Sequence, residues 1–133
     1  MTLQWEAFLD RVRDLGRYTT AHHAEHVLEA VLAVLGSQLT GEERCDLAAA
    51  LPVRARTALA APIPLTQPVP APAFVEAVAR ELDTTLAQAR WDASAVLVAL
   101  GGLVGDRLTD RLLTHLPRGY ALLFGRADLV TTA

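Results

Sequence analysis

Residues 8–52, "FLDRVRDLGRYTTAHHAEHVLEAVLAVLGSQLTGEERCDLAAALP", decide the fold because their pattern returns later in the chain. Residues 74–117, "FVEAVARELDTTLAQARWDASAVLVALGGLVGDRLTDRLLTHLP", repeat the order of apolar and helix-ending residues, with a slip of one residue in the first loop. The matched pairs are Phe8 with Phe74, Val12 with Val78, Thr19 and Thr20 with Thr84 and Thr85, Ala24 with Ala89, Val31 with Val96, Leu35 and Gly36 with Leu100 and Gly101, Leu47 with Leu112, and Leu51 and Pro52 with Leu116 and Pro117. Pairs of this kind are what two copies of one structural unit retain, so the pattern predicts an internal repeat.

Each copy is expected to form three helices. In the first copy, apolar residues recur every three or four positions over residues 3–15 and 20–35, as on the buried face of a helix. A third helix is expected over residues 40–51, and Pro52 ends it because the residue before a proline is disfavoured in helical geometry. Gly16 is predicted to end the first helix, since glycine readily adopts the left-handed conformation found there.

Helix starts and the segments after each Leu-Pro complete this prediction. Thr40 with Glu43, and Thr85 with Gln88, fit the capping box that opens a helix. The short segments that follow are "VRARTALA" in the first copy and "RGYALLFG" in the second. Because the second segment is far more apolar, we expect residues 120–124 to pack against the bundle as a last turn.

The copies are joined by residues 62–72, "PIPLTQPVPAP", which hold five of the seven prolines. An extended polyproline segment of this length reaches roughly 34 Å, more than the about 24 Å of a 16-residue helix. A unit of about 50 residues buries little core alone, so residues 1–61 and 73–133 are expected to share one core. The fold class predicted is all-α, two pseudo-repeated three-helix units packed as one helical bundle. The same linker would permit exchange of halves between two chains.

Composition narrows the functional classes. Hydrophobic residues make up 52% and aromatic residues 5% of the chain, which indicates an aliphatic, helical core. A net charge of −3 gives no electrostatic reason to expect a nucleic-acid partner. Acidic residues interrupt the apolar N-terminus, unlike a signal peptide, and no apolar run approaches the ~20 residues of a membrane span. With Cys45 as the single cysteine, we expect a cytoplasmic protein without an internal disulfide or a membrane association.

Three of the four histidines lie within five positions. His22 and His26 are four residues apart, a spacing that can hold a metal on one helix face, and Glu29 would be a third ligand. The apolar stripe of the same helix turns these three residues toward solvent. A solvated helix face is therefore the preferred interpretation, with a metal site and a pH-sensitive contact as alternatives. We expect no cofactor.

Residues 87–105, "AQARWDASAVLVALGGLVG", are apolar nearly all round beyond Asp92, so this helix is either central to the bundle or faces a partner. Trp91 on it is either a packing residue or an interface anchor, a role for which tryptophan is favoured. Trp91, Tyr120 and Phe124 are the interface candidates. No residue places a base beside Cys45, and no catalytic constellation is recognisable.

The stretches "FLDRVRDLG", "AEHVLEAVLAVLGSQL", "DLAAALP" and "LPRGYALLF" together resemble the bacterial domain-of-unknown-function family 2267 over nearly the whole chain. The resemblance implies an all-helical, duplicated fold in soluble bacterial proteins, often actinobacterial. It implies no reaction, ligand or catalytic residue, because the family is uncharacterised.

The functional hypothesis is a non-enzymatic protein-interaction module that self-associates, an adaptor or regulator in bacterial stress physiology with a protein partner or a homodimer. It follows from the apolar helix 87–105, from Trp91 and from the lack of a catalytic constellation. The alternative is a helical bundle that binds a small ligand or a metal.

Overall fold

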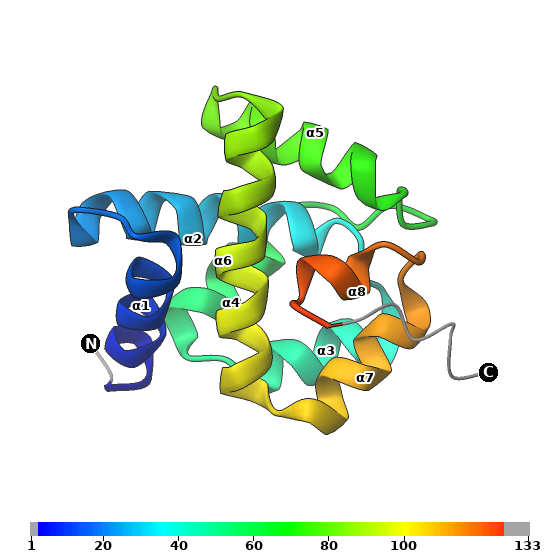
Figure 1. The fold of residues 1–133 in the computed structure, drawn as a ribbon. Coiled ribbons are helices and arrows are strands. Elements are labelled where there is room, and N and C mark those ends of the chain that lie inside the picture. Colours follow the sequence, from blue (N-terminus) through cyan, green and yellow to red (C-terminus); the bar gives the residue numbers. More distant parts are fainter. Residues whose placement is uncertain (1–2, 127–133) are drawn as a thin grey trace.

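A computed structural model of the chain describes residues 3–126, which form eight helices and no strand. The helices, in chain order, are α1 (Leu3–Gly16), α2 (Ala21–Gly36), α3 (Gly41–Ala50), α4 (Val53–Ala60), α5 (Ala71–Leu82), α6 (Leu86–Val104), α7 (Asp106–His115) and α8 (Tyr120–Leu123) (Figure 1). The all-α prediction is confirmed. None of the helices in this range is long and apolar enough to cross a membrane.

The segment after the first Leu-Pro differs from the expectation of three helices per copy. Residues 53–60 form a full helix, α4, and Pro52 stands directly before it as the N-cap residue. Proline both stops the preceding helix and suits the start of the next, because its fixed φ is compatible with a first helical turn. In the second half the corresponding segment forms only the four-residue α8.

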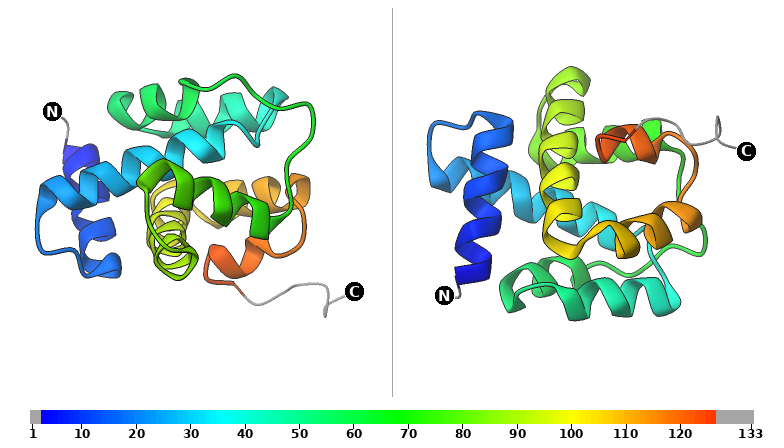
Figure 2. Two further views of the ribbon diagram at one scale, coloured as in Figure 1. Left: turned by 90° about the horizontal axis from the view of Figure 1, so that it is seen from above. Right: turned by 60° about the horizontal axis from the view of Figure 1, so that its bottom comes forward.

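Helices α2 and α6 form the centre of the bundle. Helix α2 packs against α1, α4, α5 and α6, and α6 packs against α1, α2, α5, α7 and α8. Figure 1 shows α6 crossing in front of α2, with the other helices arranged around this cross, and Figure 2 shows the same arrangement from two further sides. The helix expected either to be central or to face a partner is therefore central, and its residues are buried nearly all round from Asp92 to Leu100.

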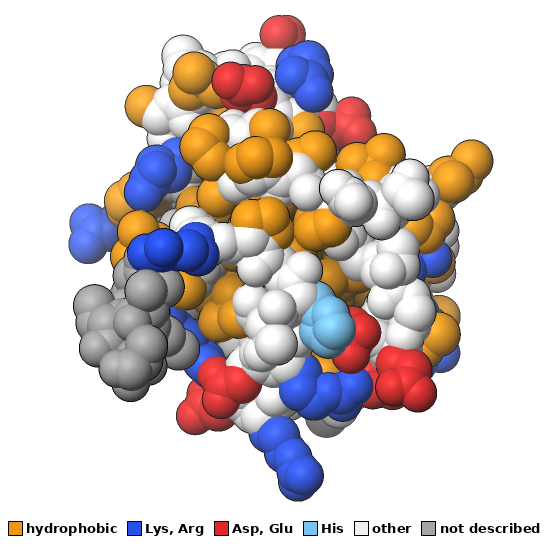
Figure 3. Space-filling view, turned by 90° about the vertical axis from the view of Figure 1, so that its right-hand side faces the viewer, with side chains coloured by type: hydrophobic (Ala, Val, Ile, Leu, Met, Phe, Trp, Pro, Cys, Tyr) orange, Lys and Arg blue, Asp and Glu red, His pale blue; other side chains and the backbone are white. Residues whose placement is uncertain are grey.

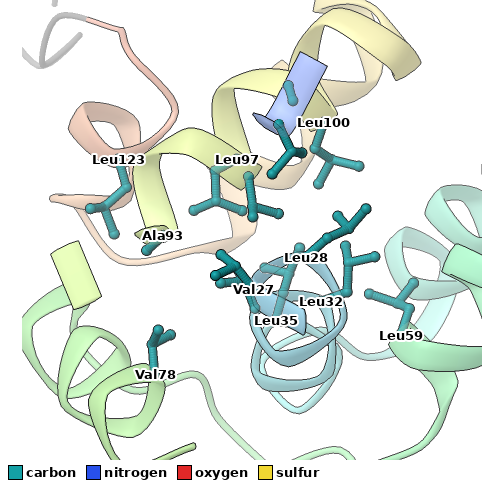
Figure 4. Packing of buried hydrophobic residues seen from close by; sticks show 14 of the residues in the cluster. Val27, Leu28, Leu32, Leu35, Leu59, Val78, Ala93, Leu97, Leu100 and Leu123 are labelled. Atoms are coloured by element: carbon teal, nitrogen blue, oxygen red, sulfur yellow. The ribbon is translucent and has the colours of Figure 1, made fainter. Parts of the chain in front are cut away.

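One hydrophobic cluster contains side chains from both halves of the chain. Figure 4 shows Leu28 and Leu32 of α2 in the same interior as Leu97 of α6. The apolar residues matched between the two sequence copies all lie in this cluster, and they are Phe8, Val12, Ala24, Val31, Leu35, Leu47 and Leu51 with Phe74, Val78, Ala89, Val96, Leu100, Leu112 and Leu116. Full burial of each large aliphatic side chain favours folding by about 1.5–3 kcal/mol, so the matched residues supply much of the stability. The duplication itself stays a prediction.

Helix α1 ends at Gly16, as predicted, but not because Gly16 adopts the left-handed conformation. Gly16 is the last helical residue, and the left-handed backbone belongs to Arg17, whose φ is 58°. Glycine is needed at position 16 because a Cβ there would lie 2.0 Å from Cε2 of Tyr18. The aromatic ring thus occupies the space of the missing side chain.

Helix α5 ends in the same way as α1. Asp83 has a φ of 52°, the backbone N–H of Thr84 donates to Ala79 O at 3.0 Å, and that of Tyr18 donates to Arg13 O at 3.1 Å. Such bonds satisfy carbonyl groups that a helix end leaves without a partner. The turns that lead into α2 and α6 therefore have similar backbone conformations.

The predicted caps are realised unequally. Thr85 Oγ1 accepts a hydrogen bond from the Gln88 N–H at 3.1 Å, but the Gln88 side chain does not return to the cap and donates to Asp92 instead. Thr40 precedes α3 without any side-chain cap bond. The capping box predicted there is wrong, since the Glu43 carboxylate pairs with groups on α7.

The proline-rich linker is held at several points. Val69 is bound from both halves, since its N–H donates to Gln38 Oε1 at 2.7 Å and its carbonyl accepts from the Tyr120 hydroxyl at 2.7 Å. The Leu65 N–H donates to Ser37 O at 2.8 Å. The linker is shorter than predicted, because residues 71 and 72 form the first turn of α5, where proline is tolerated. Figure 2 shows the linker running along one side from α4 to α5.

Candidate functional site

The turn between α1 and α2 and the turn between α5 and α6 border a cleft of about 570 Å³. We call it the aromatic cleft. Its lining residues are Gly16, Arg17, Tyr18, Thr19, His23, His26, Val27, Leu82, Asp83, Thr84, Gln88, Trp91 and Asp92. The cleft draws on both halves of the chain, so it exists only when the halves are packed together.

A buried polar pair forms one wall of the aromatic cleft. The Tyr18 hydroxyl donates to Asp92 Oδ1 at 2.5 Å, and Gln88 Nε2 donates to the same oxygen at 2.8 Å. Burial, followed by the hydrogen bond and the charge of Asp92, raises the pKa of Tyr18 far above its ordinary value. The Tyr18 hydroxyl therefore stays protonated at neutral pH and donates a hydrogen bond. In this state it is neither a nucleophile nor a base.

Trp91 lies at the edge of the aromatic cleft, on the first turns of α6. Its side chain is 48% exposed, the indole Nε1–H donates to Gly16 O at 2.9 Å, and this carbonyl belongs to the end of α1. One edge of the ring is thus fixed while much of its apolar surface faces solvent. The arrangement suits either of the two roles expected of Trp91, and it makes the exposed surface rigid.

The histidines divide between the cleft and the open surface. His23 and His26 line the aromatic cleft, and the His23 ring lies with its centroid 4.7 Å from that of Tyr18. His22 is exposed and outside the cleft lining. Glu29, the expected third metal ligand, pairs with Arg54 of α4 at 3.4 Å. Within residues 3–126 no three His, Cys, Asp or Glu side chains are grouped so as to hold a metal ion.

Two of the three interface candidates lie in the core. Tyr120 is fully buried with its ring centroid 5.3 Å from that of Phe74, and Phe124 is 5% exposed. Their apolar surface is already covered by the chain's own helices, so in this fold neither side chain is presented to a partner. Burial also raises the pKa of the Tyr120 hydroxyl. Cys45 is exposed on α3, outside the aromatic cleft.

A second hollow, of about 390 Å³, lies between α5, α6 and α8. We call it the apolar groove. Its lining residues are Ala71, Pro72, Val75, Glu76, Leu86, Ala87, Arg90, Gly119, Leu122 and Leu123. This groove has little signal in the sequence, because its walls come from three separate segments. The local signal is Leu86, an apolar residue directly after the helix cap Thr85. Figure 3 shows hydrophobic side chains gathered in the upper half of the side that carries α8 and the linker.

The comparisons with known proteins bear on the family alone. No curated protein matches the chain. A family model described as "Uncharacterized conserved protein (DUF2267)" matches residues 5–123, from α1 to the end of α8. The match includes both turns of the aromatic cleft and all three walls of the apolar groove. The chain therefore belongs to the DUF2267 family.

Proposed function

We propose that the protein is a non-enzymatic interaction module that binds a segment of a partner protein in the aromatic cleft and also associates with a second copy of itself. The observation that carries the proposal is Trp91, which is half exposed yet held by its hydrogen bond to Gly16 O. A module that binds two partners without catalytic groups acts as an adaptor or regulator, and a bacterial cytoplasm is the setting we propose for it.

The exposed part of the Trp91 indole would supply much of the free energy of partner binding. Covering about half of a tryptophan side chain removes on the order of 100 Å² of apolar surface from water, worth about 2–3 kcal/mol. Because the ring is already oriented, little conformational entropy is lost when a partner binds. Gln88 and the histidines beside it offer polar contacts, which give a binding site its orientation.

A capture experiment with a matched control tests the partner site. Full-length wild-type protein, Trp91→Ala and Leu65→Ala serve as baits in lysate of the source organism. Leu65 on the linker is 44% exposed, so its truncation removes a similar apolar surface elsewhere. We expect a protein recovered by wild type and Leu65→Ala and lost with Trp91→Ala. Equal recovery by the Trp91→Ala bait contradicts the proposed role.

A small ligand is the second candidate occupant of the aromatic cleft. The volume of about 570 Å³ falls in the range of small-molecule sites, and both rings and hydrogen-bonding groups line it. The fluorescence of Trp91 reports on binding at this cleft. Because the chain has a second tryptophan, Trp5, the emission of Trp91 is obtained by subtracting the spectrum of Trp91→Phe from that of the wild type. Quenching by a metabolite extract after removal of macromolecules favours the ligand. Quenching only by the protein fraction favours the partner segment.

A further inference from the structure

The apolar groove has exposed apolar walls that the aromatic cleft does not use. Leu86 of α6 and Leu122 of α8 are 56% and 52% exposed, whereas Val75 and Leu123 at the same groove are buried. Exposed leucines beside buried apolar residues form an apolar surface, and covering that surface would be favourable. A partner that covers the groove must therefore bring apolar side chains of its own.

The charges at the groove are of opposite sign. Glu76 of α5 and Arg90 of α6 are its charged lining residues, and both are exposed. Neither makes an ion pair within residues 3–126. A complementary partner must place a base against Glu76 and an acid against Arg90, in addition to apolar side chains.

We propose that the occupant of the apolar groove is a second copy of this chain, related by a two-fold axis. This inference rests on the self-association proposed above and names its surface. In a two-fold interface, if residue i contacts residue j of the second copy, then j also contacts i. Glu76 of each copy then meets Arg90 of the other, and the two sets of leucines cover one another. A purely acidic or purely basic partner would match only one of the two charges.

Charge exchange tests this geometry with the full chain. Sedimentation velocity between about 1 and 500 µM measures the dissociation constant of the dimer. Glu76→Arg places two like pairs across the axis, and Arg90→Glu does the same with the opposite sign. We expect each single variant to weaken self-association about tenfold or more, because like charges that face each other across an interface repel. The double variant Glu76→Arg/Arg90→Glu restores it.

The decisive sample is the mixture of the two single variants. One variant then carries two bases at its groove and the other two acids, so both contacts are complementary only in a one-to-one heterodimer. A heterodimer tighter than either homodimer supports the two-fold groove. Leu122→Gln should also weaken the dimer, whereas Ile63→Gln, at a linker residue that is 87% exposed, should not.

The opposite results separate this inference from the proposed function. A wild-type dimer that survives both single variants and gains nothing from their mixture uses another surface, which overturns the groove and leaves self-association standing. A wild type that remains monomeric over the whole concentration range overturns both the groove as an interface and the proposed self-association.

Discussion

Raising the pH above 10 should destabilise the fold through its two tyrosines. Tyr18 and Tyr120 are the chain's tyrosines, both are buried, and burial raises the pKa of each hydroxyl. In the unfolded chain they ionise near pH 10. Above that pH the unfolded state loses protons that the folded state keeps, so the free energy of unfolding falls as pH rises.

The magnitude follows from proton linkage. Below pH 10 both states are protonated and the stability from tyrosine burial is fully present. At pH 11.5 the loss is about 2 kcal/mol for each tyrosine whose folded pKa lies well above that pH, and therefore about 4 kcal/mol for the two. The chain contains no lysine, and its arginines titrate above about 12, so these phenols dominate the interval between pH 10 and 11.5.

Urea unfolding followed by circular dichroism at pH 9, 10, 11 and 11.5 measures this loss. Tyr18→Phe should retain about half of the pH dependence, and Tyr18→Phe/Tyr120→Phe should remove it. Absorbance at 295 nm is a second readout, which requires only the wild-type protein, because tyrosinate should form only as the protein unfolds. Ionisation of both tyrosines near pH 10 in the folded protein, with constant stability, would refute the reasoning.

Three further predictions concern packing and metal binding. Gly36→Ala should lower the free energy of unfolding by about 2–3 kcal/mol, because a Cβ there would lie 1.9 Å from Leu59 O of α4. Gly102→Ala, at a helical position whose Cβ meets open space, should instead stabilise by about 0.5–1 kcal/mol in the same urea assay. Calorimetric titration with Zn²⁺ should give the same heat with the wild type and with His22→Ala/His26→Ala. A binding signal seen only in the wild type would contradict the interpretation of these histidines as part of a solvated helix face.

Periodicity predicted most of the helices because it reports burial directly. The stripes over residues 3–15 and 20–35 correspond to α1 and α2, and the apolar stretch 87–105 is the central helix α6. A helix surrounded by other helices is apolar on every side, and that property is visible in a single segment. The local pattern of apolar residues is therefore sufficient to predict these helices.

The first three helices end within about one residue of the predicted positions, but the contacts at those ends were predicted less well because tertiary packing decides them. Glycine at position 16 suggests a C-cap, but the Tyr18 ring needs that space and the left-handed residue is Arg17. Glu43 matches a capping box, yet the cation Arg111 of α7 lies within 3.4 Å and competes for its carboxylate. A single-segment pattern such as a capping box does not include these contacts from distant residues, so it predicts the helix start but not the partner of each side chain.

The aromatic cleft depends on contacts between residues that are far apart in the sequence. Tyr18 and Asp92 are separated by 74 residues, and the contact between Trp91 and Gly16 spans 75. Neither contact can be predicted from the sequence around one of its residues, because the residues within each segment do not indicate the distant partner. Tyr120, by contrast, was named as a surface candidate although its apolar neighbours already indicated a core position.

The relation between core and cleft follows from which residues the two sequence copies share. The matched apolar residues are buried, so substitution at any of them is constrained by packing in its own half. Thr19 and Thr84 of the aromatic cleft are matched between the copies, but the residues that give the cleft its character differ, since Trp91 stands opposite His26 and Asp92 opposite Val27 in the alignment. If the chain arose by duplication, the shared residues preserved the bundle while the differing ones were free to build one asymmetric site between two similar halves. A single half, even if it folded, would then lack one wall of that site, which is why the proposed partner binding belongs to the intact chain.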